Sequence, residues 1–417
     1  MNNLQGKKNS AWLLIFLGWL IYSTSYLGKV NYSANITQII DFYGITKAQA
    51  GLVPTFFFFA YGIGQVINGL FCKKYNIKWM IFLSLFISAT INLFIAVGSD
   101  FSVVKWLWLI NGFVLSVLWP TVVRLLSETL PQKSLGTSSV VMGTTVATGT
   151  LVIYALSSVF AIFDNFKLAF YTAAFCVYIV SFCWLFLYKR AVEKAVKEKE
   201  KDTLTEEKSS DTESAAFENK EKKLFFVSVC ILCFCAIGVN LIKDGLTTWV
   251  PSILKEEFSM TDSLSILLTL FLPILAVFGN MCALRMHKSI PDYVNHCTIV
   301  FAIMSILIGV IIGSLSLKLV AFMLVGLISV NFLASSLNSL ITSIYPLFMR
   351  GKVNSGLFAG VLNGFCYVGS TISSYGLGVI ADLFGWSAVF WTLIFFCVIV
   401  VVVWILYAIF KMLLNKN

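Results

Sequence analysis

The chain consists mainly of long apolar runs separated by short polar segments. A transmembrane helix needs about 20 mostly apolar residues, and twelve runs in this sequence are candidates. Strands of a membrane barrel would be short and would alternate apolar with polar residues, so the pattern predicts an all-α membrane protein with 12 transmembrane helices. We expect the first helix to continue beyond the membrane towards Ile40. The predicted spans are 11–30, 50–71, 79–97, 103–127, 138–161, 168–188, 224–250, 262–284, 297–314, 317–343, 354–380 and 386–411.

One charged segment, residues 189–223, interrupts this pattern. It holds equal numbers of basic and acidic residues and few apolar ones, a composition that indicates a mixture of frayed helix and disorder. Six predicted spans precede it and six follow it. We therefore expect three parts: an N-terminal six-helix bundle (1–188), a cytoplasmic charged linker (189–223) and a C-terminal six-helix bundle (224–417).

The two halves of the chain also repeat one another at a nearly constant offset. Because each half holds six spans, both halves enter the membrane from the same side, and the repeat is parallel. Two such bundles, with a site between them near the membrane midplane, are the architecture of many secondary transporters. The paired positions are Lys29 and Lys243, Pro131 and Pro346, Gly136 and Gly351, Asp164 and Asp382, and Phe170 and Phe390.

Several predicted spans carry a stripe of polar residues along one helical face. Residues spaced by three, four and seven positions share a face of a helix, and such a face points away from lipid. The alternative is that these groups only join helices by hydrogen bonds. Spans 297–314 and 386–411 have no such stripe and should face lipid. The stripes are Tyr22, Tyr26 and Lys29; Tyr61, Gln65 and Asn68; Asn240, Lys243 and Thr247; Asn331, Ser335 and Asn338; and Asn363, Tyr367 and Ser370.

Two of the stripe residues, Lys29 and Lys243, are charges deep inside apolar runs. A lysine at the bilayer centre costs roughly 2.5–3.5 kcal/mol on insertion scales, so it is seldom placed there without a function. The alternative is snorkelling, in which each ammonium group reaches the lipid headgroups. Apolar residues continue beyond both lysines, which favours the first interpretation. The pair therefore predicts one central site for an anion.

Asp244 is the only acidic residue well inside a predicted span. A proton-coupled carrier usually needs a relay of Asp, Glu or His within the membrane, and Asp244 is the only candidate for that role. Consecutive residues point about 100° apart on a helix, so we expect Asp244 to meet a group on another helix, such as Lys29, or to face the outer mouth. A charge-pairing role is favoured over a proton-carrying one.

The composition places the chain in a membrane. Hydrophobic residues make up 59% of it and charged residues only 12%, whereas about 25% is usual in soluble proteins. The net charge of +10 lies in short loops on one side, which predicts cytoplasmic termini in a multi-pass protein of a bacterial plasma membrane and not a nucleic-acid site. Cys230, Cys233 and Cys235 have no nearby histidine, so we expect no metal site there. The sequence also offers no Ser-His-Asp arrangement and no phosphate-binding glycine loop, so we expect no cofactor and no enzymatic activity.

Two motifs resemble a known family. The segment Tyr26-Leu27-Gly28-Lys29-Val30-Asn31 is similar to the first-helix pattern of the organophosphate:phosphate antiporters, in the major facilitator superfamily. Lys243 and the Gly245, Trp249, Pro251 and Leu254 that follow it are similar to that family's seventh-helix pattern. The chain departs from the family in having lysines where the antiporters have two arginines, Gln65 where one carrier has lysine, and Val146 where it has histidine.

The resemblance implies a secondary transporter that moves a small organic anion, such as a sugar phosphate, by rocker-switch alternating access. Inorganic phosphate would be the counter-substrate, and the protein would act as a monomer. A symporter of organic carboxylates and a ligand sensor that does not transport remain open. The expected substrate-binding residues are Lys29, Lys243, Tyr22, Tyr26, Tyr61, Gln65, Asn240, Asn331, Asn363 and Tyr367, with Asp244 in coupling or charge pairing.

Overall fold

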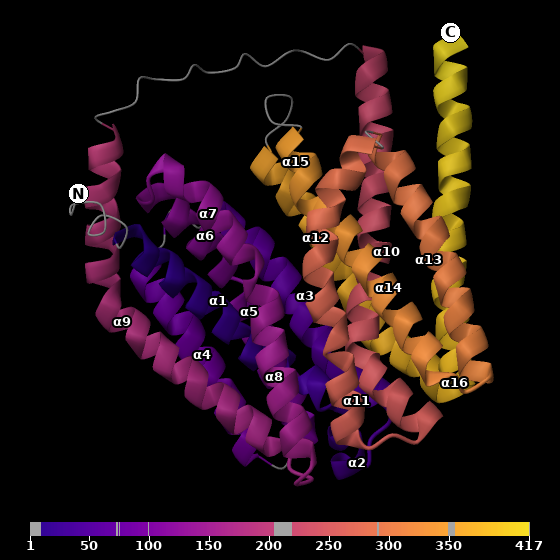
Figure 1. Cartoon of the computed structure of the whole chain (residues 1–417), viewed down its shortest axis with the longest axis horizontal. Coiled ribbons are helices and arrows are strands. Elements are labelled where there is room, and N and C mark those ends of the chain that lie inside the picture. Colours follow the sequence, from indigo (N-terminus) through magenta and orange to yellow (C-terminus); the bar gives the residue numbers. More distant parts are fainter. Residues whose placement is uncertain are drawn as a thin grey trace, which may run out of the picture.

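The computed structural model is helical in every element that it describes (Figure 1). It describes residues 10–71, 74, 76–98, 100–203, 219–289, 292–348 and 355–416. The helices are α1 (Ser10–Ala34), α2 (Ile36–Tyr43), α3 (Lys47–Phe71), α4 (Ile77–Val97), α5 (Phe101–Leu115), α6 (Leu118–Thr129), α7 (Gln132–Gly143), α8 (Thr145–Ala161), α9 (Lys167–Thr203), α10 (Asn219–Phe258), α11 (Asp262–Thr269), α12 (Phe271–Ser289), α13 (Tyr293–Ser316), α14 (Val320–Ser339), the π-helix η2 (Leu340–Ile344), α15 (Tyr345–Phe348) and α16 (Ser355–Lys416).

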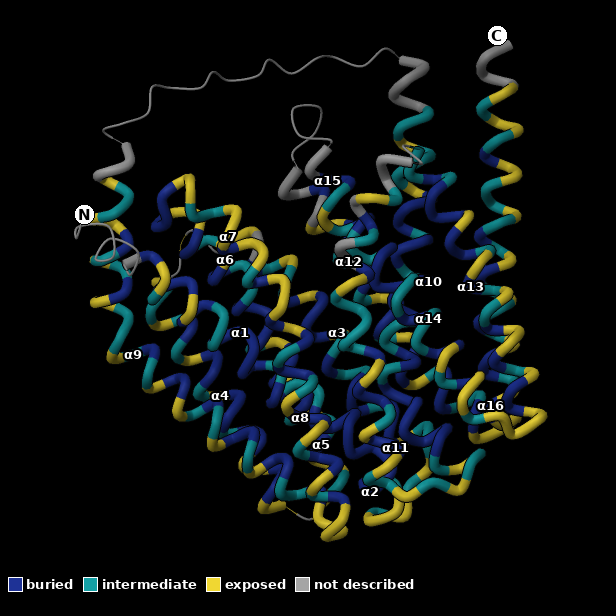
Figure 2. Tube along the Cα trace, viewed as in Figure 1, coloured by how far each residue is buried: buried dark blue, intermediate teal, exposed yellow. Residues whose placement is uncertain are grey.

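Eleven helical stretches in the described residues are long and apolar enough to cross a membrane. This confirms the all-α, multi-pass prediction in its coarse form. The last stretch, Gly360–Met412, has 53 residues and includes Gly385, whose φ of 77° and ψ of 177° are not helical. The helix is therefore interrupted there, at a conformation that glycine adopts without a steric penalty. Many large apolar residues are exposed, as lipid contact requires, and exposed positions recur along the outer helices (Figure 2).

Prolines explain two of the breaks inside predicted spans. A proline lacks the N–H that would bond to the carbonyl four residues earlier. Pro120 lies four residues after Ser116, where α5 gives way to α6, and Pro273 lies four residues after Thr269, the last residue of α11. The spans predicted as 103–127 and 262–284 are consequently each two helices.

Two further prolines lie within unbroken helices, and the carbonyls that they leave unbonded find other partners. Pro54 in α3 leaves the Ala50 carbonyl oxygen, which accepts a hydrogen bond from the Tyr32 hydroxyl at 3.0 Å. Pro251 in α10 leaves the Thr247 carbonyl oxygen, which accepts one from the Tyr154 hydroxyl at 3.1 Å. Because Tyr154 lies on α8 and Thr247 on α10, the second bond joins helices from different halves of the sequence.

Helical structure extends into the segment that the sequence assigns to a linker. Helix α9 continues past the predicted span end at 188 to Thr203, and α10 begins at Asn219, before the predicted span start at 224, which agrees with the expected helical content of the linker. The Glu198 carboxylate accepts a hydrogen bond from the Ala11 amide at 3.0 Å, which ties this extension to α1. Residues 204–218, and Gly351 of the internal repeat, lie outside the described residues.

Helices α1–α9 and α10–α16 form two groups that touch most closely at one end, away from the chain termini (Figure 1). A cluster of charges, here called the closed-end cluster, joins the groups there. The Asp382 carboxylate accepts hydrogen bonds from the backbone amides of Lys47, at 3.1 Å, and Ala48, at 2.7 Å, at the start of α3. Lys47 Nζ also lies 3.1 Å from Glu256. Asp382 thus caps a helix of the other group, where a negative charge is favourable.

Asp382→Asn should loosen this end of the molecule. The change removes a negative charge that faces a helix N-terminus and Lys47. We expect the attraction between the two groups of helices to fall by about 1 kcal/mol, which raises the ratio of molecules open at this end to molecules closed there roughly fivefold. Spin labels at Phe163 and Leu317, which are exposed on the two groups, would report longer distances by pulsed electron resonance. Asp164→Asn, the change at the repeat-equivalent position, is the control. An unchanged distance distribution in Asp382→Asn would contradict the role of the cluster.

Candidate functional site

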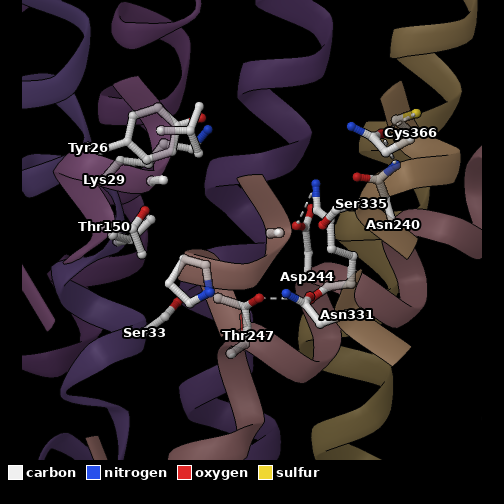
Figure 3. Close-up of a pocket in the computed structure, with 18 of the residues that line it drawn as sticks. Tyr26, Lys29, Ser33, Thr150, Asn240, Asp244, Thr247, Asn331, Ser335 and Cys366 are labelled. Carbon is white, nitrogen blue, oxygen red and sulfur yellow. Dashed lines mark hydrogen bonds and ion pairs between the residues drawn. The ribbon is translucent and has the colours of Figure 1, made fainter. Parts of the chain in front are cut away.

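A cavity of about 280 Å³ lies between the two groups of helices. Both central lysines, Lys29 and Lys243, are on its wall. The other lining residues (Figure 3) come from α1, α3, α7, α8, α10, α12, α14 and α16. No described residue of α13, or of α16 beyond Tyr367, is on this wall, which agrees with the absence of a polar stripe in those spans. Four of the five predicted stripes therefore have members on one shared wall, whereas the stripe Tyr61, Gln65 and Asn68 has none.

The ammonium group of Lys29 lies among four aromatic rings. Its Nζ is 4.3 Å from the centre of the Tyr61 ring, 4.8 Å from Tyr26, 5.5 Å from Phe57 and 6.0 Å from Tyr367. Such contacts stabilise a cation by about 0.5–2 kcal/mol each. Among the described residues, no carboxylate lies within ion-pair distance of Lys29. Its charge is therefore held by rings and not neutralised by a carboxylate.

Buried asparagines fix the part of α1 that carries Lys29. The Gly28 carbonyl oxygen accepts hydrogen bonds from Asn92 of α4, at 3.2 Å, and from Asn111 of α5, at 2.8 Å. Asn31 donates to the Asn92 side-chain oxygen at 2.8 Å. Buried polar groups need such partners, and here they set the position of α1 one residue before Lys29 and two after it.

Lys243 forms an ion pair with its sequence neighbour. Its Nζ lies 3.4 Å from Asp244 Oδ1, and the other carboxylate oxygen accepts a short hydrogen bond from the Ser370 hydroxyl of α16. The bond from Ser370 agrees with the prediction that Asp244 meets a group on another helix, whereas its ion pair with Lys243 was not predicted. The four-carbon lysine side chain is flexible, and it bridges the angle between consecutive positions.

The structure places the predicted site residues at two depths. Three of them, Tyr22, Tyr61 and Gln65, lie behind the wall, and each contacts a residue that is on it. The centres of the Tyr22 and Tyr26 rings are 5.6 Å apart. Tyr61 contacts the Lys29 ammonium group, and Gln65 accepts a hydrogen bond from Asn363. The predicted residues on the wall are Tyr26, Lys29, Asn240, Lys243, Asp244, Asn331, Asn363 and Tyr367.

Sequence reasoning missed other members of the site. Ser33 and Thr150 line the cavity on the α1–α9 side (Figure 3), and Cys366 lines it on the other. Ser33 lies four residues after Lys29, so its helical spacing was a usable signal. Phe57 of the Lys29 ring cluster gives no such signal, because apolar residues surround it in the sequence.

Amides supply the neutral polar groups of the wall. Asn240 donates a hydrogen bond to Asn338 at 3.0 Å, and Asn331 donates one to the Leu272 carbonyl at 3.0 Å. The side-chain oxygen of Asn331 is buried and has no hydrogen-bond partner among the described residues. The wall therefore combines cations for an anionic group with amides for a polar remainder.

Comparisons with known proteins bear on the family and the fold of the chain. The family model of the Major Facilitator Superfamily matches residues 18–359. The glycerol-3-phosphate transporter of Bacillus subtilis is 25% identical over 415 residues, covering 94% of this chain and 90% of its own. The hexose-6-phosphate:phosphate antiporter of Escherichia coli is 24% identical over 411 residues, covering 91% and 86%. The crystal structure of a bacterial homologue of the human lysosomal transporter Spinster, at 14% identity, has a TM-score of 0.71 over 99% of this chain and 98% of its own.

Proposed function

This chain belongs to the major facilitator superfamily, and from that premise we propose that it is a secondary transporter of a small phosphorylated organic anion, such as a sugar phosphate or glycerol phosphate. It would carry its substrate across a bacterial plasma membrane by alternating access of one central site. The two relatives described above transport phosphorylated compounds according to their names. A transporter, and not an enzyme, is what the family membership supports.

The proposed membrane topology has twelve spans in two bundles of six, residues 1–188 and 224–417. The 53-residue stretch Gly360–Met412 would be about 80 Å long as one straight helix, far more than a hydrocarbon core of about 30 Å. Division at Gly385 gives two spans from this stretch and hence twelve in all. Basic residues in the short loops support cytoplasmic termini, and the protein would act as a monomer.

The observation that carries the proposal is the presence of one lysine from each group of helices on the wall of a single cavity. Lys29 and Lys243 would bind the phosphate group, since cationic donors form the stronger, charge-assisted hydrogen bonds. Tyr26, Tyr367 and the wall amides would contact the remainder of the substrate. Tyr22, Tyr61 and Gln65 would support these residues from behind the wall.

Exchange against inorganic phosphate is the proposed mode of coupling. Asp244 is the only carboxylate among the described residues of the wall, and it is committed to Lys243 and Ser370. A relay of protonatable groups, which proton-coupled carriers use, has no further member there. A second anion that binds the same two lysines from the other side of the membrane would drive the return step.

Proteoliposomes loaded with inorganic phosphate provide the test. We expect uptake of labelled glucose 6-phosphate or glycerol 3-phosphate to be several-fold faster than into liposomes loaded with chloride. Uptake that depends on a proton gradient and favours dicarboxylates would point to the symporter alternative. Binding of these ligands without uptake under either condition would point to a sensor.

A further inference from the structure

The cavity wall carries three charged side chains among the described residues: Lys29, Lys243 and Asp244. Their formal charges leave the wall with a net charge of +1. The ammonium group of Lys29 contacts aromatic rings and has no ion pair with a described carboxylate, whereas Lys243 lies 3.4 Å from a carboxylate oxygen. The two lysines that the repeat places at equivalent positions are therefore unequal: one is available to a ligand, and the other already has an anionic partner.

Contacts on both sides hold Asp244 in this position. One carboxylate oxygen faces Lys243 on the same helix, and the other accepts the hydrogen bond from Ser370 on α16. The side chain is only 18% exposed. A ligand that approaches Lys243 thus meets a fixed negative charge, which repels a second anion in a partly dry site much more strongly than it would in water.

We infer that Asp244 is a specificity-determining residue that competes with the substrate for Lys243 and so sets how many negative charges the bound group carries. This inference rests on the proposed function. A group with one negative charge needs only Lys29 and leaves the Lys243–Asp244 pair intact. A group with two charges has to share Lys243 with Asp244. The carboxylate therefore reduces the advantage of a doubly charged phosphate over a singly charged group of the same shape.

Asp244→Asn separates this effect from ordinary packing, because asparagine keeps the shape of the side chain and can still accept the bond from Ser370. The probes are glucose 6-phosphate and glucose 6-sulfate, with glycerol 3-phosphate and glycerol 3-sulfate as a second pair, all at pH 8. With a second pKa of about 6, the phosphate esters then carry two charges, and the sulfate esters carry one. Calorimetry or thermal shift on the purified full-length protein gives the dissociation constants.

The Coulomb energy scales with ligand charge, so the gain in affinity should be about threefold for the sulfate ester and about tenfold for the phosphate ester. Ser370→Ala, which leaves all three charges in place, should change both affinities by the same factor. If Asp244→Asn does not insert stably, Asp244→Ser tests the same charge.

Each outcome has one meaning. A rise in the preference for phosphate over sulfate in Asp244→Asn alone supports the inference. Equal changes for the two esters, or none, overturn it while leaving the transport proposal intact, because the wild-type protein still binds. If the wild-type protein binds neither phosphate ester, the proposed function fails and the inference fails with it.

Discussion

Lys29→Ala should abolish uptake of the phosphorylated substrate while the protein remains folded in the membrane. Lys29 is the cation on the described wall that has no ion pair with a carboxylate, and its ammonium group lies among aromatic rings. Loss of a charge-assisted hydrogen bond costs about 1.5–3 kcal/mol, which is roughly 10- to 150-fold in the dissociation constant. Transport should fall by at least that factor, because binding precedes every later step. Initial uptake rates in phosphate-loaded proteoliposomes would measure the loss.

Two further variants separate the charge from the shape of Lys29. Lys29→Met keeps an unbranched side chain against the rings and should lose as much activity as Lys29→Ala. Lys29→Arg keeps the charge and offers a fork that matches phosphate oxygens, so it should retain substantial uptake. Lys105→Ala removes a lysine that does not line the cavity and serves as the matched control. Normal transport by Lys29→Met would show that the charge is unnecessary and would exclude the proposed site.

Lys243→Ala should be at least as damaging, and a second substitution should partly reverse its effect. Removal of Lys243 leaves Asp244 as an unneutralised carboxylate on the cavity wall, and one-sided loss of a buried ion pair is more costly than loss of both members. We expect a loss of more than about 100-fold in substrate affinity for the single variant, from the missing attraction and the added repulsion together. Lys243→Ala/Asp244→Asn should recover roughly tenfold of it.

These variants form a double-mutant cycle for Lys243 and Asp244, two residues in contact. Dissociation constants for glucose 6-phosphate and glycerol 3-phosphate would be measured for the wild type, both single variants and the double variant. Asp244→Asn alone should bind more tightly than the wild type, so the sign of its effect is the same in both backgrounds. A double variant no better than Lys243→Ala would mean that Asp244 exerts no repulsion on the ligand.

The helices and their polar faces could be predicted from the sequence because both depend on local properties. Run length and hydropathy identified the membrane spans, and spacing by three, four and seven residues identified Tyr26, Lys29, Asn240 and Lys243 as members of polar faces. The breaks near Ser116 and Leu270 had a local cause as well, in Pro120 and Pro273. Helix was expected in part of the charged linker, but the end of α9 at Thr203 was not, since charged residues with good helix propensity do not reveal where a helix ends.

Other features of the site depend on how the helices are rotated and packed. Tyr22, Tyr61 and Gln65 share stripes with wall residues, yet a stripe covers a wide arc of a helix, and packing alone decides which part of that arc meets the cavity. The sequence alone determined that this protein is a bundle of membrane helices with two matched internal lysines. Only the tertiary structure decided that the two lysines line one cavity, that Ser370 of α16 binds Asp244, and that Asp382 caps a helix of the other group, because these contacts join residues that lie far apart in the chain.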